Sequence, residues 1–157
     1  MVSVTALREC DIFRGFPAGA LEGVAGLCQE QTYKAGALII AEGEQASTLY
    51  VLLGGMVSLR ICPREGHELT VGIIGSRGDT FGWSALVEPR RYTASAACLE
   101  DCQVLAIPGA QLLAYLEEHP ETGFMVIRRL ASIISSRLQE TRSHLSSLMV
   151  PGHIERG

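Results

Sequence analysis

The segment that decides the fold is Gly78-Asp79-Thr80-Phe81-Gly82-Trp83-Ser84-Ala85-Leu86, followed closely by Arg90-Arg91-Tyr92-Thr93-Ala94-Ser95. Two glycines bracket a turn, and the residues after Gly82 favour a short helix that must end before Pro89. The first N–H groups of a helix have no partner within the helix and therefore attract anions. The segment predicts an anion-binding turn, although a plain connector between two strands would fit the same residues.

Short apolar runs on both sides of this segment predict β-strands. Glycine interrupts the runs at intervals of about a dozen residues or less, which is typical of a β-sandwich or β-roll. The double glycine Gly54-Gly55 between two of the runs predicts a hairpin or a bulge with positive φ. The predicted strands after the first, which ends near Tyr33, are 38–40, 49–53, 56–61, 69–74, 93–98 and 103–107.

Both ends of the chain show helical periodicity. Residues 5–30 are predicted to be helical, because apolar residues recur there at helical spacing. Helices also return over 111–149, with a break at His119-Pro120. We therefore expect one α+β, mainly β, domain: N-terminal helices over 1–30, an antiparallel β-roll or jelly roll over 31–110, C-terminal helices over 111–149 and a tail over 150–157.

The long C-terminal helix, from about Glu121 to Met149, carries a heptad pattern. Its apolar positions alternate in steps of four and three residues, as in a coiled coil. Phe124, Met125 and Val126 are expected to pack on the chain's own roll instead. The remaining narrow stripe predicts a two-fold dimer through this helix, with the interface residues Ile127, Ala131, Ile134, Leu138, Thr141, Leu145 and Leu148.

Several short motifs resemble those of cyclic nucleotide-binding domains, the β-roll effector domains found in catabolite activators. They stand in the family's order and spacing across about residues 10–145. The resemblance implies a regulatory ligand-sensing roll with its ligand cassette at 78–95. The motifs are Tyr33-x-x-Gly36, Glu42-Gly43-Glu44, Leu49-Tyr50-x-Leu52-x-x-Gly55-x-Val57, Gly78-Asp79-x-Phe81-Gly82, Ala85-Leu86 and Thr93-Ala94-Ser95.

The cassette departs from the family at two positions. Trp83 stands where the family has a glutamate that binds the ribose hydroxyl, and Tyr92 stands where it has an arginine that pairs with the cyclic phosphate. Losing one member of a buried ion pair costs about 3–5 kcal/mol. We therefore expect weak or altered cyclic nucleotide binding. Arg90 or Arg91 could substitute for the missing arginine, or both could lie in a solvated loop.

The resemblance also implies a set of candidate ligand-binding residues. Thr141 joins them because the segment Arg137-Leu138-Gln139-x-Thr141 resembles the helix part of the activators whose threonine reaches the ligand base. A polar residue in an apolar heptad could instead set only the helix register. The cassette candidates are Phe81, Gly82, Trp83, Ser84, Ala85, Leu86, Arg90, Arg91, Tyr92, Thr93 and Ala94.

Other classes of function are disfavoured by the composition. The four histidines are isolated, the five cysteines are scattered, and no nucleophile or carboxylate pair is placed for catalysis, so we expect neither an enzyme nor a metal site. The net charge of −4 gives no footprint for nucleic acid, and too few residues follow the long helix for a helix-turn-helix domain. The sequence has no signal-peptide pattern and no membrane-spanning run, which favours the cytoplasm.

Three functions remain open. The first is a ligand-responsive regulatory module that acts through an unknown protein partner. The second is a dimeric interaction scaffold whose pocket has closed. The third is a genuine cyclic AMP or cyclic GMP binder that uses Arg90 or Arg91. No cofactor is expected apart from a cyclic nucleotide or another small anionic ligand.

Overall fold

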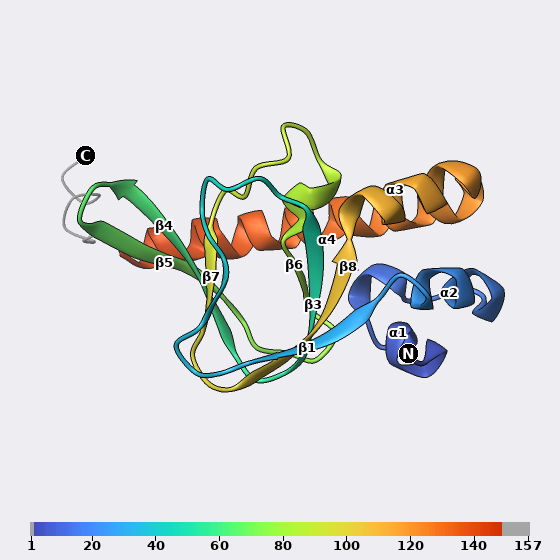
Figure 1. Ribbon diagram of the computed structural model, residues 1–157. Coiled ribbons are helices and arrows are strands. Elements are labelled where there is room, and N and C mark those ends of the chain that lie inside the picture. The colour runs from blue at the N-terminus through green and yellow to red at the C-terminus, as the bar shows by residue number, and fades with distance from the viewer. Residues whose placement is uncertain (1, 149–157) are drawn as a thin grey trace.

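The computed structural model describes residues 2–148, an antiparallel β-roll between N-terminal helices and a long C-terminal helix (Figure 1). The helical elements are α1 (Val4–Arg8), the 3-10 helix η1 (Asp11–Phe13), α2 (Ala18–Ala25), the 3-10 helix η2 (Trp83–Leu86), α3 (Gly109–Glu118) and α4 (Pro120–Ser147). The strands are β1 (Gln29–Tyr33), β2 (Leu38–Ile40), β3 (Thr48–Gly54), β4 (Val57–Arg64), β5 (His67–Ile74), β6 (Thr80–Phe81), β7 (Ser95–Cys98) and β8 (Cys102–Pro108).

The strands form two four-stranded sheets in the described part of the chain. Their orders are β1-β8-β3-β6 and β2-β7-β4-β5, and every pairing is antiparallel. The predicted α+β, mainly β, fold class and the antiparallel roll are therefore confirmed. The β4–β5 hairpin projects at one end of the roll, and α1–α3 lie at the other (Figure 1).

The central strands β8 and β3 of the sheet β1-β8-β3-β6 are buried on both faces because their side chains alternate between two cores. On β3, Leu49, Val51 and Leu53 face the helices, whereas Tyr50 and Leu52 face the interior of the roll. Strand β8 alternates in the same way. Successive side chains of a strand point to opposite faces. A strand that lies between two cores, as β3 and β8 do, therefore needs apolar residues at consecutive positions.

The helix α4 runs along the length of the molecule, past α3 at its start and past β5 nearer its end (Figure 1). Its 28 residues span about 42 Å. Gly123, Val126 and Leu130 are its buried residues. Phe124 is 64% exposed and Met125 37% exposed. The expectation that both pack on the roll was therefore wrong, and only Val126 of that triplet does so.

Of the two predictions for the double glycine, the hairpin was wrong, whereas the bulge with positive φ agrees with the structure. Strand β3 ends at Gly54 in one sheet, and β4 begins at Val57 in the other, so the segment crosses between sheets and is not a hairpin. The alternative of a bulge agrees with a register shift between Leu52 and Gly54. Gly55 has φ +96°, and a Cβ there would lie 2.5 Å from the carbonyl oxygen of Asp101. Close packing against the β7–β8 turn therefore requires glycine.

The N-terminal helical region ends earlier than expected. Strand β1 begins at Gln29, within the range 1–30 assigned to helices, and pairs with β8 from Gln29↔Ala106 onward. Pairing with β8 outweighs the helical pattern of these two residues.

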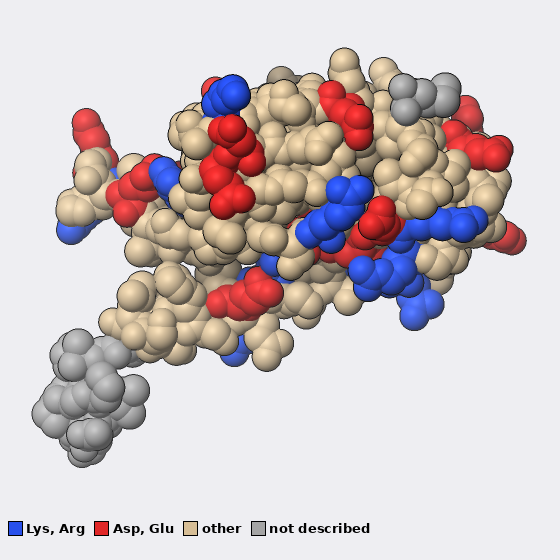
Figure 2. Space-filling view, turned by 90° about the horizontal axis from the view of Figure 1, so that it is seen from below, with Lys and Arg blue, Asp and Glu red and all other residues tan. Residues whose placement is uncertain are grey.

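Among residues 2–148, no helix has the length and apolar character needed to cross a membrane. On the face shown in Figure 2, acidic and basic side chains intermingle.

Candidate ligand-binding site

The cassette turn is built around Gly82. Strand β6 brings Phe81 opposite Tyr50 of β3, and their rings stack with centroids 5.4 Å apart. Gly82 then adopts φ +75°, a left-handed conformation that favours glycine, before η2 begins. A Cβ at Gly82 would lie 3.0 Å from Ile40 and 3.2 Å from the Thr48 carbonyl oxygen. The turn is therefore pinned between β2 and β3.

Two cassette residues support the turn from behind. Ala85 and Leu86 are buried, and Leu86 belongs to the core formed with α3 and the N-terminal helices. Gly109, at the start of α3, comes so close that a Cβ there would lie 2.6 Å from the Ala85 carbonyl oxygen. Ala85 and Leu86 therefore position the cassette, but neither residue lines the two cavities described below. The helix η2 that contains them is a single turn of four residues.

Tyr92 makes a paired contact at the position of the family's arginine. Its hydroxyl donates to the carbonyl oxygen of Thr48 over 2.6 Å and accepts from the Thr48 N–H over 3.2 Å. Burial raises the pKa of Tyr92 above its ordinary value, so the phenol is neutral near neutral pH. The position offers a neutral hydrogen-bonding group in place of a cation.

The neighbouring arginines are engaged elsewhere. The Arg91 guanidinium donates to the carbonyl oxygen of Gly43 over 2.9 Å. The Arg90 Nε lies 3.8 Å from the carboxylate of Glu88 but has no hydrogen-bond partner among residues 2–148, and the Arg90 backbone has φ +58°. Both side chains lie outside the set of residues that line the cavities beside the cassette. The structure therefore does not place either arginine where it would replace the missing one.

Two adjoining cavities lie next to the cassette. One, of about 50 Å³, is bounded by Ile40, Phe81, Gly82, Ser84 and Tyr92 together with four residues that it shares with the second cavity. The second, of about 170 Å³, lies between β4, β5 and α4. The residues common to both are Leu59, Trp83, Thr93 and Ala94. The smaller volume is far below the roughly 300–1,000 Å³ of ordinary ligand pockets.

The helix α4 supplies the polar wall of the larger cavity. Arg137 Nη1 donates to a carboxylate oxygen of Glu140 over 3.1 Å, and Arg137 Nη2 lies 3.7 Å from Asp79 Oδ1. The Thr141 hydroxyl donates to the Val71 carbonyl oxygen over 3.4 Å. Thr141 thus lies with Trp83 in one cavity of the same chain. Sequence reasoning missed Arg137 as a site residue, although it begins the segment that singled out Thr141.

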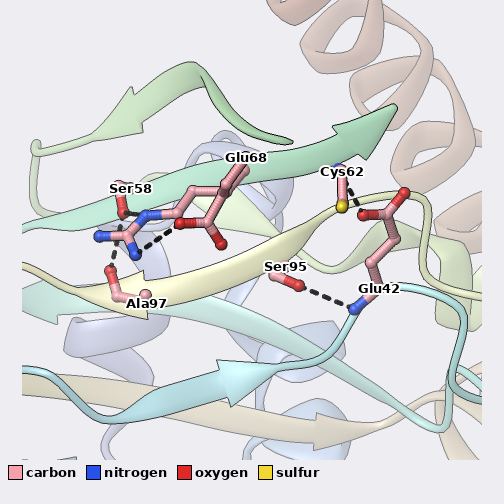
Figure 3. Close-up of polar contacts among 7 residues, drawn as sticks. Glu42, Ser58, Cys62, Glu68, Ser95 and Ala97 are labelled. Carbon is pink, nitrogen blue, oxygen red and sulfur yellow. Dashed lines mark hydrogen bonds and ion pairs between the residues drawn. The ribbon is translucent and has the colours of Figure 1, made fainter. Parts of the chain in front are cut away.

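The sheet wall of this region is held by polar contacts between strands (Figure 3). Ser58 donates to the Ala97 carbonyl oxygen over 3.4 Å, joining β4 to β7. Glu42, just after β2, accepts from the Cys62 N–H over 2.9 Å, and its own N–H donates to Ser95 over 2.9 Å. These contacts hold β4 in place, and Leu59 and Ile61 of this strand line the larger cavity.

The heptad residues of α4 lie mostly in solvent in the single chain. Ile127 is 47% exposed, Leu138 59%, Leu145 43% and Leu148 57%, and Ala131 is also exposed. Ile134 is half-buried and packs against the core, and Thr141 is half-buried beside β5. Most of the predicted interface is therefore left exposed by the chain's own roll.

Comparison with known proteins adds an independent finding. Residues 30–119 match the family described as the cyclic nucleotide-binding domain. The chain is 25% identical, over 96% of its length, to a CRP-like cAMP-activated global transcriptional regulator of Mycobacterium tuberculosis. It is 28% identical, over 90% of its length, to the cyclic AMP receptor protein of Thermus thermophilus. It spans only 66% and 63% of these relatives.

Solved structures agree with the sequence comparison. The Thermus thermophilus catabolite activator protein superposes with a TM-score of 0.71 at 28% identity, covering 88% of this chain and 62% of that chain. A Geobacter metallireducens protein named for cyclic nucleotide binding superposes with a TM-score of 0.78 at 29% identity, covering 88% of this chain and 99% of that one. The family match covers more than half of the 157 residues. The chain belongs to the cyclic nucleotide-binding domain family.

Proposed function

We propose that this protein is a regulatory, ligand-sensing domain that binds ordinary cyclic nucleotides weakly and signals through a protein partner. The observation that carries the proposal is the contact of Tyr92 with Thr48. It puts a neutral phenol where a cyclic phosphate needs a cation, and it leaves a cavity of about 50 Å³ beside the cassette turn. The family membership and the regulatory relatives support the sensing role.

The proposal includes a homodimer through α4. The exposed Leu138 and Leu145 lie one heptad apart, a spacing that suits a partner helix in a coiled coil. Two copies of α4 would bury this apolar stripe. Because α4 also carries Arg137 and Thr141 at the larger cavity, occupation of the cavity and pairing of the helices would involve the same element.

The test is calorimetric titration of the purified chain with cyclic AMP, cyclic GMP and cyclic dinucleotides. We expect cyclic AMP and cyclic GMP to bind more weakly than micromolar. Sub-micromolar binding of either nucleotide would contradict the proposal, because neither Trp83 nor Tyr92 supplies the polar contacts of the family.

A second function is favoured by the small size of the cassette cavity. At about 50 Å³, it is far smaller than the roughly 300–1,000 Å³ of ordinary ligand pockets. A dimeric scaffold with a closed pocket would show no ligand-dependent thermal stabilisation with any small molecule. Saturable stabilisation by any member of a fragment library would exclude this alternative.

A further inference from the structure

The larger cavity has the size of one aromatic ring. It measures about 170 Å³, and an apolar cavity of about 150 Å³ is known to hold benzene. Its sheet side is formed by Leu59, Ile61, Val71 and Ile73, with Trp83 at the boundary to the cassette cavity. Ile73 is 45% exposed, which leaves an entry from solvent. A complete nucleotide would have to extend into the 50 Å³ cavity next to it.

The polar wall contains a donor without an acceptor. Arg137 lines the cavity, and its Nε is buried with no hydrogen-bond partner among residues 2–148. Its side chain is only 16% exposed. A buried donor without a partner costs free energy in the empty protein. A small turn of the guanidinium that brings an N–H of Arg137 to a ligand oxygen in the cavity would relieve this cost.

The charge of Arg137 is already balanced. Asp79 lies 3.7 Å from one terminal nitrogen, and Glu140 accepts a hydrogen bond from the other over 3.1 Å. Glu140 itself lines the cavity. An anionic ligand would therefore meet one cation accompanied by two carboxylates, whereas an uncharged acceptor would take an N–H of Arg137 without repulsion.

We propose that the larger cavity binds a small, uncharged, largely apolar ligand, about one ring in size, whose oxygen accepts from Arg137. The inference deepens the proposed sensing function and rests on it. The ligand class differs from a cyclic nucleotide in size and in charge.

The chain provides its own reporter for this site. Trp83 is the single tryptophan, and it lines both cavities. Benzamide is the probe, because it combines one ring with an uncharged carbonyl oxygen. Toluene lacks the acceptor, and benzoate carries a charge. We expect benzamide to change Trp83 emission saturably, and toluene and benzoate to bind at least tenfold more weakly.

Two variants locate the binding. Gly72→Val fills the cavity from β5; a Cβ at Gly72 would lie 3.6 Å from Leu59, an ordinary contact, and valine suits a strand. Arg137→Met removes the donor while keeping a long side chain. Each should weaken benzamide at least tenfold. The matched control is Arg142→Met on the exposed side of α4, which should bind benzamide like the parent.

The outcomes separate the inference from the proposed function. No saturable response to benzamide, tighter binding of benzoate, or parental affinity in both Gly72→Val and Arg137→Met would each overturn the inference. The proposed function would survive those results if calorimetry found another small ligand. Sub-micromolar cyclic AMP binding by the Gly72→Val protein would overturn both the inference and the proposed function. It would show that the cassette binds cyclic AMP tightly while the larger cavity is filled.

Discussion

The phenolic oxygen of Tyr92 lies 2.6 Å from the carbonyl oxygen of Thr48 and 3.2 Å from its amide nitrogen. One side chain therefore satisfies both backbone groups of the residue that starts β3. The contact ties the segment that closes the cassette to the central sheet. Tyr92, at the position of the family's arginine, therefore has a structural role in the roll.

Tyr92→Phe should destabilise the protein by about 1–3 kcal/mol, because it leaves two backbone groups of Thr48 without their side-chain partner. Urea unfolding measures the loss. Tyr33→Phe is the control, since the Tyr33 hydroxyl donates to the Gln31 side chain and holds no backbone group. Equal losses in the two variants would contradict a special role for the Tyr92 contact.

Arg91→Ala should leave the weak cyclic AMP affinity unchanged within error. Its guanidinium donates to the Gly43 carbonyl oxygen and lies outside both cavities. Calorimetry of parent and variant under the same conditions makes the comparison. A parent that binds below micromolar and a variant that does not would show that Arg91 replaces the missing arginine after all.

The fold was more accessible from sequence than the site. The roll was predicted from glycine spacing and apolar runs, which are local features of the sequence. Gly82, for example, is required by the left-handed backbone of its own turn. Whether Gly54-Gly55 joins paired strands or crosses between sheets depends on distant pairing, with β8 taking the place beside β3. The periodicity of residues near the turn does not contain that information.

The site depended even more on distant contacts. Sequence reasoning identified Trp83 and Tyr92 as departures from the family, and both line the cavity next to the cassette. It could not show that Arg137 reaches Asp79, 58 residues earlier, nor that Arg91 faces Gly43. The orientation of a long side chain is decided by the partners that the fold brings near it.

Asp11 should give the stability a distinct pH dependence. Burial raises the pKa of Asp11, although its hydrogen bond from Thr80 acts in the opposite direction. The folded state then binds the proton more tightly than the unfolded state, so this contribution is fully present below about pH 4 and is lost as pH rises through the folded pKa.

Asp11→Asn should therefore remove this loss of stability with rising pH, because the asparagine side chain accepts a hydrogen bond from Thr80 and does not titrate. Urea unfolding of parent and variant from about pH 4 to about pH 7 should show that the variant's relative stability increases with pH. Glu22→Gln, at an exposed position of α2, is the control and should run parallel to the parent. A parallel curve for Asp11→Asn would show that Asp11 has no raised pKa.

Leu138→Glu should give a monomer at concentrations where the parent is a dimer. Leu138 is 59% exposed in the single chain, so the substitution should leave the monomer fold intact while placing a charge in the apolar seam of the pair. Sedimentation measures the mass. Gln139→Glu adds the same charge at the neighbouring exposed position and should remain dimeric. If both variants are dimers, the interface lies away from the α4 heptad.

Thr141→Val should weaken ligand binding and leave dimerisation unchanged. The Thr141 hydroxyl donates to the Val71 carbonyl oxygen of its own chain, and the residue lines the larger cavity. Valine keeps the shape of the side chain and removes only this tie between α4 and β5. We therefore expect a weaker Trp83 response to benzamide together with a parental dimer dissociation constant. If Thr141 only set the helix register, the change to valine would add an apolar residue to the seam and tighten the dimer. A tighter dimer with parental benzamide affinity would therefore remove Thr141 from the site and assign it to the interface alone.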